Sequence, residues 1–404
     1  GPPPPPPPAA PSGGEAPWQQ QKRERTERER RDALEAIARA KELEARKRDL
    51  ESRLPALRGH DIASVPWDSA LLGTHLCGGK GADGLNGLLS GAGGVDVVEL
   101  AGGTAVCVRS GPSVVTEIIA DALAAALGVR VARMRLVLAG SEECRAIHEA
   151  SKRWRSAGIE QEMAQIEQKL DTVDAEAAAR LRAMLQPATC AVLEFVPGAS
   201  LDTAAAALRA PSPALLAGLG HLCALDLLLN NMDRLPLPCW GTAGNLTNAI
   251  VTAAGELVGI DQQVNRIKPG PDLDDYLGKV RLLSAQVLQG GAPEAATSIR
   301  TAIRTHCGAE LSDASVARVV EGMAAVLRRA ALEAREGGLR EALDAAAAQA
   351  DAADASFGPA GHATIVGAGG AAAADVQFVM QVVRAVPEEG ARGWRTVLPF
   401  CCAR

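Results

Sequence analysis

The order of elements in residues 226–261 constrains this chain of 404 residues more than any other feature of its sequence. An apolar run over about 214–230 predicts a long helix, and Asn-Asn-Met-Asp-Arg (230–234) predicts a polar loop after it. After Gly244–Asn248 we expect a short strand, a turn, and an apolar strand, Glu256–Ile260, that leads into a carboxylate. Two carboxylates and several amides are therefore expected close together, where helix, loop and strands end.

These side chains are the ones that phosphoryl transfer from a nucleotide requires. One carboxylate must receive or orient the acceptor hydroxyl, and a carboxylate with an amide oxygen must hold Mg²⁺. Asp233 is the candidate for the first role, and Asp261 and Asn248 are the candidate metal ligands. Asn245 competes with Asn248, although its place after Gly244 suits a turn. A loop without chemistry is the alternative, since Asn and Asp also cap helices and form turns.

Three nearby polar residues are expected to have structural roles. Asp226 lies on an apolar helix and needs hydrogen-bond partners if it is buried; the backbone amides of the following loop are the available ones. Arg234 is expected to hold the loop through a carboxylate or through carbonyls. His221 lies about 18 Å along the helix from Asp233, at about 1.5 Å per residue, which excludes it as the general base.

Short β-like runs divided by glycine begin near residue 88. Val95–Leu100 and Thr104–Val108 predict a hairpin. The preceding glycine-rich turn could bring backbone N–H groups close to a phosphate, although a plain β-turn is by itself the better explanation in a chain with 41 glycines. Its candidate phosphate-binding residues are Gly91, Gly93 and Gly94.

A basic residue ends this hairpin and a helix follows it. Val114–Leu127 has helical periodicity and is followed by Gly128, a common helix terminator. Arg109 closes the second strand, and Glu117 lies in the helix, so the two can pair. Kinases use such an ion pair to hold a positive charge against the α- and β-phosphates. A surface ion pair of little energetic weight is the alternative.

The remainder of the chain predicts helices. After residue 270 the periodic segments are about 271–289, 293–306, 312–335, 338–354 and 372–385.

The loop motif resembles the catalytic domain of actin-fragmin kinase, a family of atypical protein kinases related in architecture to phosphatidylinositol kinases. The specific part of the match is DLLLNNMDRLPLPCWGTAGNLTNAI (226–250) with LVGIDQQVNRI (257–267). Residues 106–137 and 192–201 add weaker support. The resemblance covers roughly residues 88–270.

The resemblance implies an α+β, two-lobed protein-kinase-like fold, with a small antiparallel β N-lobe and a mainly helical C-lobe. The expected N-lobe, with its hinge, is 62–200, and the C-lobe with a helical C-terminal extension is 201–404. The buried strand Cys190–Phe195 would form the hinge, where backbone groups near Glu194 and Val196 meet adenine.

The implied activity is ATP- and Mg²⁺-dependent phosphorylation of a protein Ser/Thr hydroxyl, with actin as the family's substrate. One residue departs from the family pattern, because the strand lysine is replaced by Arg109. Arginine is larger and forked, so the exchange is not conservative at a confined site. A pseudokinase or nucleotide-binding scaffold with little turnover is therefore the alternative. A lipid or small-molecule kinase would use the same catalytic parts.

Composition restricts the partners. A net charge of −6 and a pI near 5.7 give no electrostatic reason to expect nucleic acid. No apolar run reaches about 18 residues, so no membrane span is expected. Nine irregularly spaced cysteines without CxxC favour a reducing, cytoplasmic setting over disulfides or zinc. Residues 1–20 predict a Pro-rich disordered segment, a ligand type for SH3- or profilin-type modules, and residues 21–54 predict a charged helix.

Overall fold

The computed structural model describes residues 52–76, 95–110, 113–152, 190–355 and 371–387, with residues 1, 27, 31, 41, 45 and 49. The Pro-rich segment beyond Gly1 and the glycines at 91, 93 and 94 lie outside these residues. In the expected charged helix over 21–54, residues 27, 31, 41, 45 and 49 are helical.

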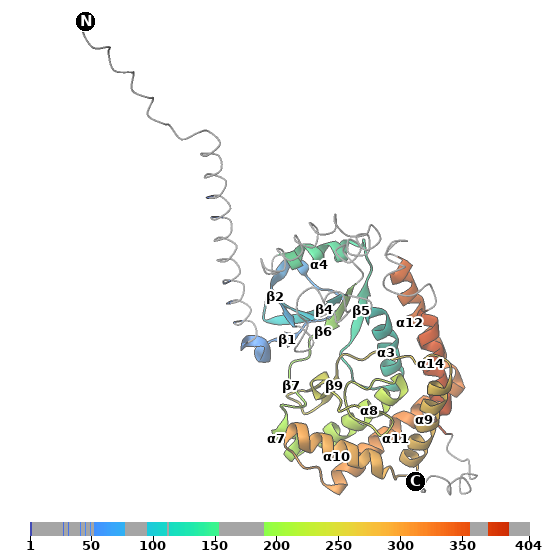
Figure 1. Ribbon diagram of the computed structural model, residues 1–404. Coiled ribbons are helices and arrows are strands. Elements are labelled where there is room, and N and C mark those ends of the chain that lie inside the picture. Colours follow the sequence, from blue (N-terminus) through green and yellow to red (C-terminus); the bar gives the residue numbers. More distant parts are fainter. Residues whose placement is uncertain are drawn as a thin grey trace.

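A six-stranded sheet forms the upper part of the molecule in Figure 1. The strand order is β2-β3-β4-β6-β5, with antiparallel neighbours, and β1 adds to β4 in parallel. The predicted hairpin is confirmed, and its second strand extends two residues further, so that Val95 pairs with Arg109. The strands are β1 (Arg58–Gly59), β2 (Ala70–Leu76), β3 (Val95–Leu100), β4 (Thr104–Ser110), β5 (Met134–Val137) and β6 (Cys190–Glu194).

Two hydrophobic cores flank this sheet. The smaller one joins the sheet to the 3₁₀ turn η2 (Trp67–Ser69) and to α4 (Glu142–Lys152). The larger one contains α3 (Ser113–Leu127), whose buried residues pack with those of the helical part of the chain. The predicted end of α3 is confirmed, because Gly128 adopts a φ of 68° that favours glycine.

A second, smaller sheet lies between the first sheet and the helices. Its antiparallel strands are β7 (Ala199–Ser200), β8 (Ala249–Val251) and β9 (Leu257–Gly259). Strands β8 and β9 were expected, whereas the two-residue β7 was not. Residues 130–132, between α3 and β5, run parallel to β9 through a bridge between Val131 and Gly259. These residues connect the two sheets.

The helical part is built around α8 (Pro213–Leu229), which is apolar on every face and buries most of its length. It packs closely on α11 (Asp313–Glu336), because a Cβ on Gly220 would lie 2.1 Å from the Val319 carbonyl oxygen. The other helices are α7 (Ala205–Arg209), α9 (Pro271–Leu288), α10 (Pro293–Cys307), α12 (Gly338–Ala355) and α14 (Ala371–Ala385).

The helices after residue 270 match the predicted ranges within one or two residues. The expected α+β class is confirmed, with a sheet-containing part and a mainly helical remainder (Figure 1). Among the helices described, none combines the length and the apolar composition that crossing a bilayer requires.

Candidate active site

Arg234 lies at the centre of the loop that follows α8, and its side chain is 0% exposed. Its Nε donates to the carbonyl of Asn248 at 3.0 Å, and Nη2 donates to the carbonyl of Ile260 at 2.9 Å. These two residues directly precede β8 and Asp261. The expected role of Arg234 is confirmed, since it holds the backbone beside both candidate metal ligands.

Asp226 completes this buried centre. Arg234 Nη1 donates to its carboxylate at 2.6 Å, and Asn231 Nδ2 donates to the same oxygen at 2.9 Å. The expectation that loop backbone amides would serve Asp226 is wrong, because the Asn231 N–H already caps the helix by donating to the Asp226 carbonyl. Burial raises the pKa of Asp226 to about 6, although the Arg234 guanidinium opposes this shift.

Asp233, Asn248 and Asp261 converge beside this centre. The amide nitrogen of Asn248 donates to the Asp233 carbonyl at 2.8 Å and to its carboxylate at 3.1 Å. Asp233 is exposed, but partial burial and then the nearby charge of Asp261 raise its pKa. Asn248 links the two candidate carboxylates, because its side chain donates to Asp233 and its carbonyl accepts from the N–H of Ile260, directly before Asp261, at 3.0 Å.

Arg109 connects this loop to the six-stranded sheet. Its Nη1 lies 2.9 Å from Glu117 Oε1 and also contacts the Asp261 carboxylate. Burial alone would lower the pKa of Arg109, but Glu117 and Asp261 outweigh burial and raise it. The Glu117 side chain is only 2% exposed, so this ion pair is not a surface pair. The predicted ion pair between Arg109 on β4 and Glu117 on α3 is confirmed, and Asp261 is an additional partner of Arg109.

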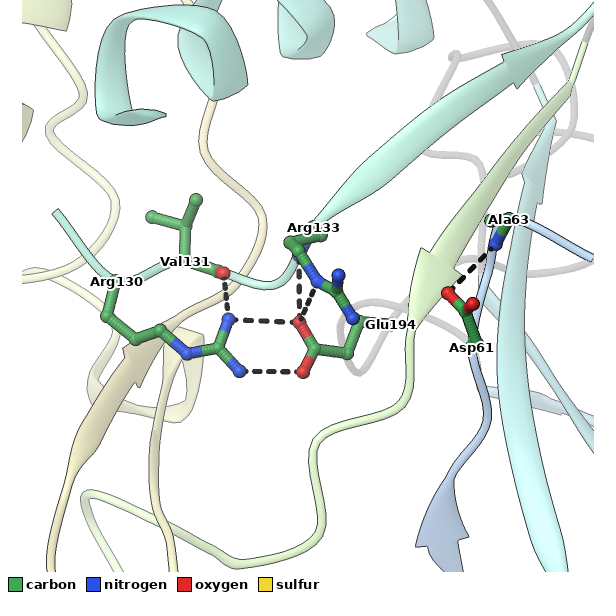
Figure 2. Close-up of polar contacts among 6 residues, drawn as sticks. All are labelled: Asp61, Ala63, Arg130, Val131, Arg133 and Glu194. Atoms are coloured by element: carbon green, nitrogen blue, oxygen red, sulfur yellow. Dashed lines mark hydrogen bonds and ion pairs between the residues drawn. The ribbon is translucent and has the colours of Figure 1, made fainter. Parts of the chain in front are cut away.

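Glu194 is the last residue of β6, and its carboxylate is occupied by arginines (Figure 2). Arg130 donates to both of its oxygens, at 2.9 and 2.6 Å, and the Arg133 N–H donates at 3.2 Å. The backbone N–H of Glu194 donates to the Arg133 carbonyl at 2.8 Å. Contact of adenine with backbone groups near Glu194 and Val196 stays a prediction, and this N–H is not available for it.

The donor set fits a magnesium ion by its chemistry. Asp261 and Asn248 offer hard oxygen ligands, and the nitrogen of Asn248 is already used by Asp233, which leaves the Asn248 oxygen for a cation. The Asn245 oxygen instead accepts two hydrogen bonds from Thr247, as a turn residue does. The described residues contain no cluster of three His, Cys, Asp or Glu side chains suited to a metal. Magnesium needs none, since it binds through one or two carboxylates and keeps waters and substrate oxygens.

Two residues of this region could not be found from the sequence. Arg130 and Arg133 lie in Gly128-Val-Arg-Val-Ala-Arg-Met134, which carries no motif. Their partner Glu194 is 64 and 61 residues further along the chain.

Gln262, beside Asp261, is buried, and its side-chain oxygen has no hydrogen-bond partner among the described residues.

Two comparisons with known proteins gave one match. Among curated proteins no match was found. Residues 84–267, just under half of the chain, match the family model described as "Actin-fragmin kinase, catalytic", which confirms the resemblance inferred from the loop motif and indicates a kinase-like phosphotransferase.

Proposed function

We propose that this protein transfers the γ-phosphoryl group of ATP, with Mg²⁺, to a Ser/Thr hydroxyl of a protein. The observation that carries the proposal is the double contact of Arg109 with Glu117 and Asp261. It joins a cation on β4, a carboxylate on α3 and the candidate metal ligand after β9. Kinases assemble the same combination of groups around the phosphates of ATP.

The roles follow from exposure and hydrogen bonding. Asp233 is exposed, so a hydroxyl on a macromolecular substrate can reach it, and the Asn248 amide fixes its orientation. We assign Asp233 to accept the proton of that hydroxyl. Arg109, held by buried Glu117, would bind the α- and β-phosphates.

Asp261 and Asn248 would hold the metal. Their position is set by Arg234, which fixes the backbone carbonyls of Asn248 and Ile260. When bound there, Mg²⁺ would neutralise the negative charge that develops on the phosphates during transfer.

The proposal includes a two-lobed arrangement. The six-stranded sheet with α3 would be the small lobe, and the helices around α8 the large one, with residues 195–198 passing between them. Actin is the substrate that the family's name suggests, and the exposed position of Asp233 fits a protein substrate in general.

Variants of the two aspartates test the roles. Asp233→Asn should abolish phosphotransfer and leave ATP binding intact, whereas Asp261→Asn should also weaken Mg-ATP binding, because it removes a formal charge from the metal. Asp68→Asn, at an exposed position of η2, is the matched control. Single-turnover phosphotransfer and thermal melts with ATP, with and without Mg²⁺, are the measurements. A bound ligand at a hundredfold excess over Kd stabilises by about 2.7 kcal/mol, so binding is visible as a shift. Wild-type activity in Asp233→Asn would refute its role.

A nucleotide-binding scaffold with little turnover is the second candidate, favoured by Arg109. One nitrogen of its fork serves both carboxylates, and the buried Nε has no hydrogen-bond partner among the described residues. A lysine could serve both carboxylates with a single compact ammonium. In the same assay Arg109→Lys should raise turnover, by up to about 10²-fold if the cation is misplaced. Binding of Mg-ATP without phosphotransfer, in the wild type and in Arg109→Lys, would establish the scaffold instead.

A further inference from the structure

The end of β6 is bound to the segment between α3 and β5 by a cluster of one carboxylate and two arginines (Figure 2). Glu194 is 15% exposed at its side chain, and Arg130 meets it with two parallel hydrogen bonds. Arg133 adds its backbone N–H at 3.2 Å and its Nε at 3.5 Å. Burial opposes ionisation of Glu194, but Arg130 and Arg133 outweigh it, so its pKa lies below the ordinary value. The carboxylate is therefore charged at neutral pH.

The same segment is bound on its other side to β9. The Gly259 N–H donates to the Arg130 carbonyl at 3.0 Å, and the Ala132 N–H donates to the Gly259 carbonyl at 2.8 Å. Residues 130–133 are thus hydrogen-bonded both to the last residue of β6 and to the last residue of β9. Asp261 follows Gly259 by two residues.

The atoms around Gly259 leave no room for a side chain. A Cβ there would lie 2.8 Å from Leu222 Cδ2, 3.3 Å from Val131 and 3.4 Å from Arg234 Cζ. Gly259 is enclosed between the 130–133 segment and the guanidinium that holds the backbone of the loop. A close-packed interior transmits displacement, so movement of residues 130–133 would displace the strand that carries Asp261.

We propose that Glu194 is a positioning residue for phosphoryl transfer, acting through Arg130 to hold β9 and Asp261 at a fixed place relative to Arg109 on β4. This role rests on the proposed function. Arg109 lies on β4, which is hydrogen-bonded to β6 in the same sheet, with Val106 opposite Glu194. Arg109 is therefore connected to Asp261 in two ways. One is their direct contact, and the other runs through β4, β6, Glu194, Arg130 and Gly259.

The test compares Glu194→Gln with Glu143→Gln. Glu143 forms the same kind of paired contact, at 2.7 and 2.5 Å to Arg135, and accepts from Trp67 at 2.9 Å, but these partners lie outside residues 130–133. Glu194→Gln should lower kcat about tenfold or more and leave the Kd for Mg-ATP within about threefold, since small misplacements of reacting groups cost rate. Glu143→Gln should change neither. The double variant Glu194→Gln/Arg130→Gln should lose little more kcat than Glu194→Gln, because both changes break the Glu194–Arg130 pair and the other hydrogen bond of Arg130 goes to the adjacent Val131 carbonyl.

Equal kcat values for Glu194→Gln and Glu143→Gln would overturn the proposal, as would a loss of rate that merely follows the loss of folded protein in thermal melts. If the wild type shows no phosphotransfer, the proposed function fails, and hydrogen exchange decides the positioning role separately. Glu194→Gln should then speed amide exchange in a peptide spanning 256–262, whereas Glu143→Gln should not. Unchanged exchange in Glu194→Gln refutes the connection to β9.

Discussion

Replacing Arg234 by methionine should be among the most damaging single changes in this protein. The guanidinium and the Asp226 carboxylate are both 0% exposed, so the variant leaves a buried charge with only the Asn231 amide. Removing one partner of such a pair costs about 3–5 kcal/mol. The carbonyl of Ile260 loses a donor as well, while that of Asn248 keeps the Ile260 N–H at 3.0 Å. Since domains are stable by only about 5–15 kcal/mol, Arg234→Met should lose a large part of the total.

A double-mutant cycle separates the charge from the packing. Asp226→Asn alone leaves the buried guanidinium unpaired and should also be destabilising, whereas Asp226→Asn combined with Arg234→Met removes both charges. We expect the double variant to be several kcal/mol more stable than the sum of the single losses predicts. Urea denaturation followed by circular dichroism measures all four free energies of unfolding. A loss below about 1 kcal/mol in Arg234→Met, with additive single effects, would show that the pair is not the support assigned to it.

Two further predictions concern the framework. Gly220→Ala should destabilise by about 1–3 kcal/mol or more, because its Cβ would overlap the Val319 carbonyl oxygen. Gly278→Ala, whose Cβ would have no atom within 4 Å, should stabilise α9 by about 0.5–1 kcal/mol. Urea denaturation of both variants checks this, and similar effects would contradict the close packing of α8 on α11. Desolvation raises the pKa of Asp121 to about 7, above the unfolded value of about 3.9, so its stabilising contribution is complete below pH 4 and is lost as pH rises through 7. Asp121→Asn should therefore be more stable than the wild type at pH 8, by about 2 kcal/mol after allowance for partial exposure, and the difference should shrink toward pH 4. A pH-independent difference would contradict the desolvation of Asp121.

Local pattern was sufficient for the later helices, for one hairpin and for the order of elements around the candidate site. Periodicity predicted the helices after residue 270, and alternation predicted the hairpin that ends near Arg109. The loop motif brought Asp233, Asn248 and Asp261 together because they follow one another along 29 residues of loop and strand. Elements and contacts of this kind depend on residues that are close in the sequence.

Contacts between distant segments were not predictable in the same way. β7 has only two residues, too few for a recognisable alternation. The Glu194–Arg130 pair joins residues 64 apart, and neither residue lies in a pattern that requires a partner. Asp226 was assigned the wrong partners because the nearest loop amide is used by the helix end, which only the three-dimensional arrangement reveals. Such pairings depend on how the two sheets are placed.

The charges of the site argue for a cation in it. Asp233, Asp261 and Glu117 are three carboxylates, and among the described residues Arg109 is the guanidinium that pairs with two of them, while Arg234 is already paired with Asp226. Nucleotide phosphates would add further negative charge next to this excess. Burial and then the charge of Asp261 raise the pKa of Asp233, and the second of these causes is the same repulsion seen without a ligand. Under the proposed function we therefore expect ATP to bind only together with a divalent cation, because the carboxylates that would repel the phosphates are the groups that would attract the cation.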